Sequence, residues 1–326
     1  MTAPDGTIVG AAGAGSVRRT KVRWLLAWAR ERFPLRNAVF FAVFYVTGLA
    51  CARAGVSGPL PLGWGDLPGF FAVWAFFLLL RVLDEHKDFA ADAVAHPQRV
   101  LQRGLVTLAD LRGVGVIAVA LQLATSLWRD GSVGPVTRWW LVALGWSLLM
   151  AREFFVGAWL RKHIMLYALS HMAVMPLVVV WIASMGGAGA PRAVAVQALA
   201  ALSFVAGLGF EMARKVRAPE DEHPDADSYT QSLGVRAATL ALLLVLVATA
   251  AAALLVVRTA GVAVRPGVAA AVAAATLAGA AALAAFAARP TRAGARRVEG
   301  AVGVAVLVGQ LVVLASLVAA RGVVVR

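Results

Sequence analysis

Long apolar runs separated by short charged connections make up most of the chain. Nine runs can be counted, each close to the roughly 20 residues that an α-helix needs to cross the hydrocarbon core of a bilayer. Because a spanning segment must satisfy its own backbone hydrogen bonds, the runs predict helices. We therefore expect an all-α integral membrane protein with nine transmembrane helices. The predicted spans cover residues 37–54, 67–84, 110–128, 139–160, 164–185, 194–213, 235–257, 263–288 and 300–320.

The composition agrees with this class of protein. Of the 326 residues, 61% are hydrophobic and 15% are charged, and the mean hydropathy is +0.79. A soluble core does not need so much apolar sequence. The formal net charge is +14. In a membrane protein, excess Lys and Arg orient the helices and contact anionic lipid, so we expect the lipid bilayer as a partner and no nucleic acid.

Lys and Arg are unevenly distributed between the two sides of the predicted bundle. They cluster before the first span and after the second, fourth, sixth and eighth spans, whereas the opposite connections contain few basic residues, such as Arg53 and Arg129. The positive-inside rule then places the N-terminus in the cytoplasm and the C-terminus outside. We expect a multi-pass protein of the inner (plasma) membrane.

The chain divides into a short N-terminal segment, residues 1–36, and a helical domain, residues 37–326. Residues 1–17 are rich in Gly and Ala, and we expect them to be disordered. Residues 17–36 interleave Arg and Lys with Trp and Leu. That pattern fits either a helix lying on the anionic membrane surface or a basic flank of the first span.

Three carboxylates lie at and just after the end of the second span, at intervals of four residues: Asp84, Asp88 and Asp92. This spacing places them on one face of a helix, where like charges repel unless a cation compensates them. Mg²⁺ prefers carboxylate oxygens and keeps positions for a substrate's phosphates, so the row is a candidate metal site. The alternative is a solvated helix end with local ion pairs, such as Arg81 with Glu85.

Two arginines come directly after this row. Pro97 ends the helix and Gly104 permits a turn, which brings Arg99 and Arg103 within reach of the acidic face. Metal together with arginine suits a diphosphate, because guanidinium groups bind phosphate oxygens in bidentate fashion. The alternative is that both arginines only mark the cytoplasmic side of the membrane.

A second charged region follows the sixth span. Its first part contains Glu211, Arg214, Lys215 and Arg217, and Glu211 can pair with Lys215 because they are four residues apart. The basic groups could bind phosphate directly. Alternatively, Glu211 completes a metal site and the acidic stretch around Asp221 is a solvated loop.

The run "DEHKDFAADAVAHPQRVLQRG" resembles the first motif of the UbiA superfamily of intramembrane prenyltransferases, which includes UbiA-type terpene cyclases. In that motif, NDxxDxxxD, the Asn position is occupied by Asp84 and the first Asp position by Glu85. Asp88 and Asp92 match the other two acids, and the later Pro, Arg and Gly also fit. "SYTQSLG" resembles the end of the family's second motif, which places Asp221 near its last acidic position. The two earlier acidic positions fall on basic residues, so this motif is altered.

The resemblance implies a nine-helix UbiA-like bundle with a central cavity open to the cytoplasm. It implies Mg²⁺-dependent ionisation of an isoprenyl diphosphate and prenyl transfer to an aromatic or lipid acceptor. The alternatives are a terpene cyclase that needs no acceptor and, from another class, a transporter. The expected catalytic residues are Asp84, Asp88 and Glu211. The expected metal ligands are Asp84, Asp88, Asp92, Glu211 and Asp221, and the expected diphosphate contacts are Arg99, Arg103, Lys162, Arg214 and Lys215.

Aromatic side chains are concentrated around the fourth and fifth predicted spans, for example Trp146 and Tyr167. Aromatic faces stabilise cations, and ionisation of an allylic diphosphate produces a carbocation. Some of these rings are therefore expected to line an apolar cavity, whereas others belong to the interfacial aromatic belt.

Overall fold

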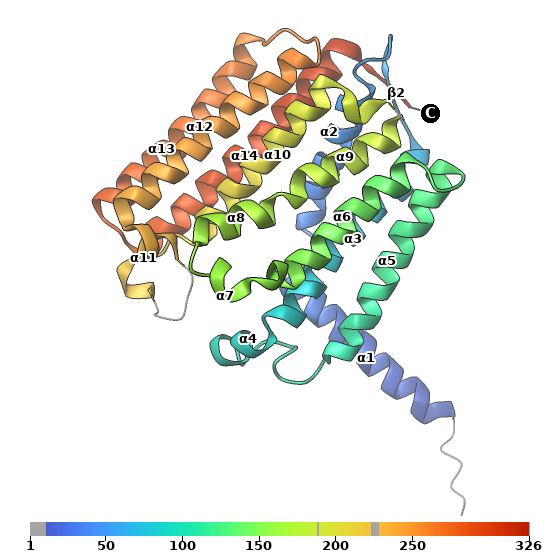
Figure 1. Cartoon of the computed structure of the whole chain (residues 1–326), viewed down its shortest axis with the longest axis vertical. Coiled ribbons are helices and arrows are strands. Elements are labelled where there is room, and N and C mark those ends of the chain that lie inside the picture. The colour runs from blue at the N-terminus through green and yellow to red at the C-terminus, as the bar shows by residue number, and fades with distance from the viewer. Residues whose placement is uncertain (1–10, 188, 223–227, 326) are drawn as a thin grey trace, which may run out of the picture.

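The computed structural model describes residues 11–187, 189–222 and 228–325, with side chains from Thr20 onward, and it is predominantly helical (Figure 1). The helices are α1 (Ala11–Arg32), α2 (Asn37–Arg53), α3 (Leu67–Lys87), α4 (Phe89–Ala95), α5 (Leu108–Asp130), α6 (Pro135–Ala151), α7 (Gly157–Leu160), α8 (Ile164–Met172), α9 (Val174–Gly186), α10 (Val194–Arg214), α11 (Tyr229–Leu233), α12 (Val235–Thr259), α13 (Pro266–Ala288) and α14 (Arg292–Arg321). The short elements are β1 (Leu60–Leu62), β2 (Val323–Val325) and the 3₁₀ turns η1 (Trp64–Asp66), η2 (Glu153–Phe155), η3 (Ala190–Arg192) and η4 (Pro219–Asp221).

Seven helical segments in the described part of the chain are long and apolar enough to cross a membrane, and an eighth is added if α1 and α2 form one bent span. The predicted multi-pass helical architecture is therefore confirmed. The count of nine stays a prediction, because α2 and α6 have only 17 residues each. Helices α8 and α9 together cover the fifth predicted span.

Helix α10 occupies the middle of the bundle and packs against α9, α12 and α14 (Figure 1). Small and β-branched side chains on these helices allow close approach, which is how helices associate where lipid competes for apolar contact. A methyl group added at Gly279 of α13 would lie 2.5 Å from Leu246 Cδ2 of α12. This close packing leaves little empty space between the C-terminal helices.

The fourth predicted span, residues 139–160, is wrong at its C-terminal end. Helix α6 ends at Ala151, and the next residues adopt left-handed backbone conformations, with φ values of 46° for Glu153, 53° for Phe154 and 62° for Phe155. Non-glycine residues pay a steric penalty in this region, so the helix cannot continue through it. Arg152 is exposed, and Glu153 forms an ion pair with the exposed Arg161.

The N-terminal helix packs on protein. Trp28 of α1 is buried in a small apolar cluster with Val82 of α3 and Leu111 of α5. Residues 1–10 of the segment that we expected to be disordered lie outside the described part of the chain. Residues 11–17 of that segment are helical, because α1 begins at Ala11. The helix therefore brings its C-terminal residues, including Arg32, to the end of α3.

The opposite end of the bundle is closed by contacts that the hydrophobic pattern did not predict. Strands β1 and β2 pair in parallel and join the loop after α2 to the C-terminal residues (Figure 1). Beside them, the Asp66 carboxylate accepts hydrogen bonds from Arg53 at 2.7 and 2.8 Å and from Arg129 at 2.8 Å. Its backbone carbonyl accepts another from the Tyr45 hydroxyl at 2.8 Å. Every oxygen of Asp66 is thus engaged at this end.

Candidate active site

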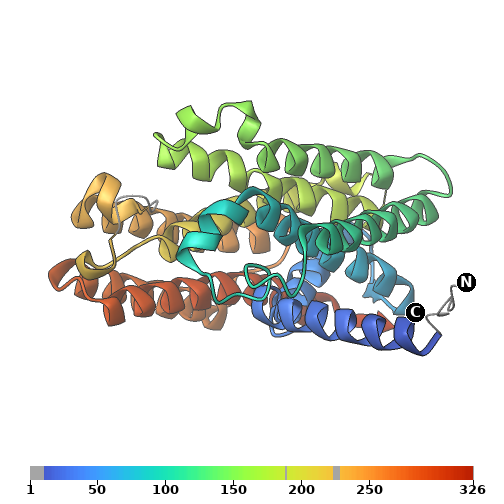
Figure 2. The same ribbon diagram turned by 90° about the horizontal axis from the view of Figure 1, so that it is seen from below.

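A cavity of about 790 Å³ lies inside the bundle, near the end that carries α4, α7 and α11. Figure 2 looks onto this end and shows α4 and the loop after it lying across its middle. Charged residues from the ends of α3 and α10 form one part of the cavity wall, and apolar residues of α2, α9 and α14 form much of the rest. The cavity is therefore strongly polar in one region and apolar in another.

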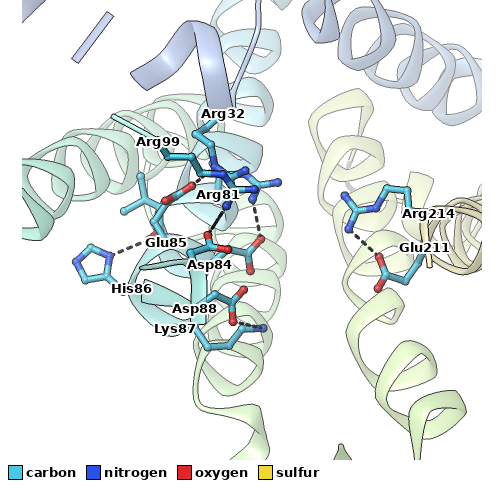
Figure 3. Close-up of polar contacts among 12 residues, drawn as sticks. Arg32, Arg81, Asp84, Glu85, His86, Lys87, Asp88, Arg99, Glu211 and Arg214 are labelled. Atoms are coloured by element: carbon cyan, nitrogen blue, oxygen red, sulfur yellow. Dashed lines mark hydrogen bonds and ion pairs between the residues drawn. The ribbon is translucent and has the colours of Figure 1, made fainter. Parts of the chain in front are cut away.

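Asp84 and Asp88 form the acidic wall of the cavity. Each has only a long ion pair, Arg81 at 3.8 Å from Asp84 and Lys87 at 3.9 Å from Asp88, and their side chains are 47% and 50% exposed. Burial raises the pKa of the Asp88 carboxyl above its ordinary value, an effect that the Lys87 ammonium opposes. Both carboxylates thus keep lone pairs available to a ligand, and Figure 3 shows them at the edge of the gap facing Glu211.

The predicted helical row does not continue unbroken to Asp92. Helix α3 ends at Lys87, and Asp88 caps it before the short helix α4 begins. Asp92 on α4 still contacts the cavity, but its carboxylate is held by Arg99 at 2.6 Å and lies 3.6 Å from Arg32. In this structure Arg99 and Asp92 are therefore each other's ion-pair partner.

Glu85, at the position of the family's first Asp, is turned to a different partner. Its side chain is fully buried, is not part of the cavity wall, and accepts a hydrogen bond from Arg32 Nε at 2.5 Å (Figure 3). The alternative considered for this helix end included a pair of Arg81 with Glu85; Arg81 instead lies 3.8 Å from Asp84, and Glu85 pairs with Arg32. Glu85 thus connects α3 to the N-terminal helix.

The charged part of the wall at the end of α10 contains two basic residues and one acid. The predicted pair of Glu211 with Lys215 is confirmed at 2.9 Å, and Arg214 lies 3.2 Å from the same carboxylate (Figure 3 shows Glu211 and Arg214). Lys215 Nζ also lies 4.9 Å from the centre of the Tyr167 ring, and Lys87 Nζ donates to the Tyr167 hydroxyl at 2.9 Å. Two lysines from opposite walls therefore meet at one aromatic ring.

Three of the predicted site residues are not part of the cavity wall. Arg103 and Lys162 are exposed and do not line it. Asp221 lies on the surface, where Arg292 of α14 contacts it at 2.5 Å. The hydrogen bond from Arg292 lowers the pKa of the Asp221 carboxyl. The structure therefore gives Asp221 a different partner from the predicted metal, whereas Asp84, Asp88, Asp92, Arg99, Glu211, Arg214 and Lys215 all meet at the cavity.

The structure adds site residues that the sequence reasoning missed. Arg32, Arg81 and Lys87 line the cavity, and its aromatic wall comes mainly from α2 and α3, where Phe41 stacks on Phe77 with ring centroids 4.4 Å apart. The expected cluster around the fourth and fifth spans contributes Tyr167. The close spacing of phenylalanines at the start of the first predicted span was an available signal. The remaining aromatic residues of the wall are Phe40, Phe44 and Phe210.

The acidic wall could supply only part of the coordination of a Mg²⁺ ion. Among the described residues, no group of three or more His, Cys, Asp or Glu side chains converges as a ready-made metal site. Mg²⁺ is commonly bound by one or two carboxylates together with substrate phosphates and water. The open carboxylates of Asp84 and Asp88 meet this requirement, whereas those of Glu211 and Asp92 are engaged by cations.

The site therefore combines a cluster of charged groups with an apolar chamber, inside a multi-pass helical bundle. No protein-family model matches the sequence, and no curated protein matches it. Two solved structures do match. One comes from work on digeranylgeranylglyceryl phosphate synthase in membranes, with a TM-score of 0.64, 14% identity, and coverage of 91% of this chain and 99% of that one.

The other is the apo structure of a UbiA homolog from Aeropyrum pernix K1, with a TM-score of 0.62 and 17% identity. It covers 88% of this chain and 98% of that one. The chain thus has the fold of UbiA-type proteins, and the resemblance inferred from the motifs is confirmed at the level of the fold.

Proposed function

We propose that this protein ionises an isoprenyl diphosphate and transfers the prenyl group to a hydrophobic acceptor. The supporting observation is the division of one cavity into a charged region and a phenylalanine-lined region. A prenyl diphosphate has the same division, with a polyanionic head and a hydrocarbon tail. The UbiA-type fold supports this proposal.

The basic groups of the cavity would bind the diphosphate. Arg81, Lys87, Arg214 and Lys215 line the charged region and can donate hydrogen bonds to phosphate oxygens. As the C–O bond breaks, negative charge increases on the departing pyrophosphate, and preorganised cations stabilise it. Mg²⁺, held by Asp84 and Asp88, would neutralise further diphosphate charge.

The apolar region would bind the tail and shield the carbocation. Phe41, Phe44 and Phe77 pack together there, with Phe44 and Phe77 in an edge-to-face arrangement at 6.1 Å. Their ring faces can stabilise a delocalised allylic cation without reacting with it. Excluding water from this region favours alkylation of the acceptor over hydrolysis.

Terpene cyclisation is the second candidate, and the altered second motif favours it. Glu211 is neutralised by Lys215 and Arg214, so the α10 wall differs from the acidic motif of prenyltransferase relatives. Such a change in the charges around the departing pyrophosphate could alter the fate of the cation. A cyclase would release a cyclic terpene from the diphosphate alone.

The cellular setting is part of the proposal. We infer that the N-terminus and the cavity face the cytoplasm of the plasma membrane, because the basic connections cluster at that end. Soluble diphosphates and Mg²⁺ are available on that side. A cysteine-labelling map of loop accessibility in intact cells tests the orientation.

One experiment tests the activity and separates the two candidates. Purified protein is incubated with C10, C15 and C20 prenyl diphosphates, with and without an aromatic acceptor, and pyrophosphate and organic products are measured. Mg²⁺-dependent pyrophosphate release that is lost in Asp88→Ala supports ionisation. Unchanged release in that variant would contradict it. An adduct supports prenyl transfer, and a cyclic product without acceptor supports the cyclase.

A further inference from the structure

We propose that arginine and lysine side chains take the place of a second metal ion, so that a prenyl diphosphate binds here with one divalent ion. That ion is held by Asp84 and Asp88. This inference rests on the proposed function, because it concerns how the same diphosphate is bound. Five metal ligands were expected from the sequence, and three of them, Asp92, Glu211 and Asp221, each form an ion pair with a cation of the protein itself.

Glu211 has a cation beside each of its carboxylate oxygens. Lys215 Nζ lies 2.9 Å from Oε1, and Arg214 Nη2 lies 3.2 Å from Oε2. The Glu211 side chain is only 13% exposed, so a metal ion could bind its carboxylate only by displacing one of these two cations. Lys215 and Arg214 both line the cavity, where they can donate hydrogen bonds to phosphate oxygens. Glu211 therefore holds two phosphate-binding cations in place.

The sequence of the second motif supports the same conclusion independently of these contacts. Counted back from "SYTQSLG", two acidic positions of the motif that it resembles fall on Arg214 and Arg217. A guanidinium group cannot bind a metal ion, because it is always positively charged and has no acceptor atom. At Arg214 the chain therefore places a phosphate-binding cation where the motif has a carboxylate.

Two acids of the first motif are also paired with arginine. Arg32 of α1 lies 2.5 Å from Glu85 and 3.6 Å from Asp92, and Arg99 lies 2.6 Å from Asp92 (Figure 3 shows Arg32, Glu85 and Arg99). The Glu85 side chain is fully buried, so a ligand in the cavity does not reach it. Neighbouring carboxylates repel each other unless a cation compensates them. The N-terminal helix thus supplies the positive charge that Glu85 and Asp92 require.

The charge of the cavity wall limits how many metal ions can enter. Among the described residues, six arginine and lysine side chains and four carboxylates line the cavity, an excess of two positive charges. A divalent ion is repelled by such a wall unless a ligand brings negative charge with it. One divalent ion together with this excess already outweighs the charge of a diphosphate. The binding of a second ion is therefore opposed by positive charge that nothing compensates.

The test counts the metal ions with Mn²⁺, which is paramagnetic and binds the same kinds of oxygen ligand as Mg²⁺. Full-length protein is titrated with Mn²⁺ in the presence of a saturating prenyl thiolodiphosphate, a non-ionisable analogue, and electron paramagnetic resonance measures free and bound Mn²⁺. We expect one bound Mn²⁺ for each bound analogue, without the spin–spin coupling that a second ion in the same cavity produces. Two coupled ions in the unmodified protein would overturn the proposal, and this result requires no variant to fold.

Two variants test whether the cations of α10 exclude the second ion. In Arg214→Asp/Lys215→Met, Glu211 loses both partners and gains a carboxylate three residues away on the same helix face, so we expect a second, coupled Mn²⁺. Arg217→Asp introduces the same acid outside the cavity wall and should leave one ion. A double variant that binds the analogue with one ion would overturn the role given to the two cations. Equilibrium dialysis measures the analogue separately: no binding to the unmodified protein contradicts the proposed function, whereas binding with two coupled ions contradicts only this inference.

Discussion

Asp66 and the pair Asp84 and Asp88 lie towards opposite ends of the α3 segment, and similar carboxylates have opposite surroundings. Asp66 is bound by two arginines at 2.7–2.8 Å and its side chain is 15% exposed. The nearest cations to Asp84 and Asp88 are 3.8 and 3.9 Å away, and these side chains are about half exposed. A saturated carboxylate can only support the structure, whereas an open one remains available to a ligand.

The largest effect on activity is expected when Asp84 and Asp88 are substituted. In Asp84→Asn/Asp88→Asn, we expect pyrophosphate release from a prenyl diphosphate to fall by about 100-fold or more, because the carboxylates proposed to hold Mg²⁺ are lost. The melting temperature in detergent should change little, since both carboxylates are half exposed and have only long ion pairs at 3.8 and 3.9 Å. A large decrease in melting temperature would show instead that Asp84 and Asp88 support the structure.

The converse substitution tests the saturated end. Asp66→Asn leaves Arg53 and Arg129 without their counter-charge, and we expect a loss of about 3 kcal/mol in the free energy of unfolding. Reversible unfolding in mixed micelles measures this change. Diphosphate binding below the melting temperature should be retained. A stable Asp66→Asn protein that fails to bind diphosphate would reverse the assignment of the two ends.

A smaller effect is expected on the basic wall of α10. Lys215→Met should weaken the binding of inorganic pyrophosphate in EDTA by about tenfold, because Lys215 lines the cavity and a charge-assisted hydrogen bond is lost. Arg217→Met, which removes the same charge two residues away and outside the cavity wall, should have little effect. Titration calorimetry distinguishes the two variants. Equal losses of pyrophosphate affinity in the two variants would indicate that the overall positive charge of this region, and not a contact by Lys215, governs binding.

The smallest effect is expected at Asp221. Its pair with Arg292 is at the surface and lowers the pKa of the carboxyl, so any stabilisation is present at neutral pH and is lost as the pH falls through the lowered pKa. Asp221→Asn should therefore cause at most a slight decrease in melting temperature at pH 7 and none at strongly acidic pH. Diphosphate binding should not change. Loss of that binding would restore the predicted metal role.

The sequence pattern predicted much of the acidic wall but less of its surroundings. Spacing by four predicted that Asp84, Asp88 and Asp92 share one helix face; the helix ends at Lys87, but all three still line one cavity. Spacing also predicted the pair of Glu211 with Lys215. It could not show that Arg99 is occupied by Asp92. That contact depends on the turn between them, and the contact of Arg32 with Glu85 depends on how α1 packs.

The hydrophobic pattern alone was sufficient to predict a multi-pass helical protein, because bilayer thickness and backbone hydrogen bonding act on each segment separately. The resemblance of the chain's first acidic motif to that of the UbiA superfamily indicated the UbiA-type fold. The tertiary structure decided which charged groups are left without a close partner. It neutralised Asp66 with Arg53 and Arg129, paired Glu85 with Arg32, and brought charged and aromatic residues of separate helices to one cavity. These outcomes depend on contacts between segments distant in the chain, which no local pattern encodes.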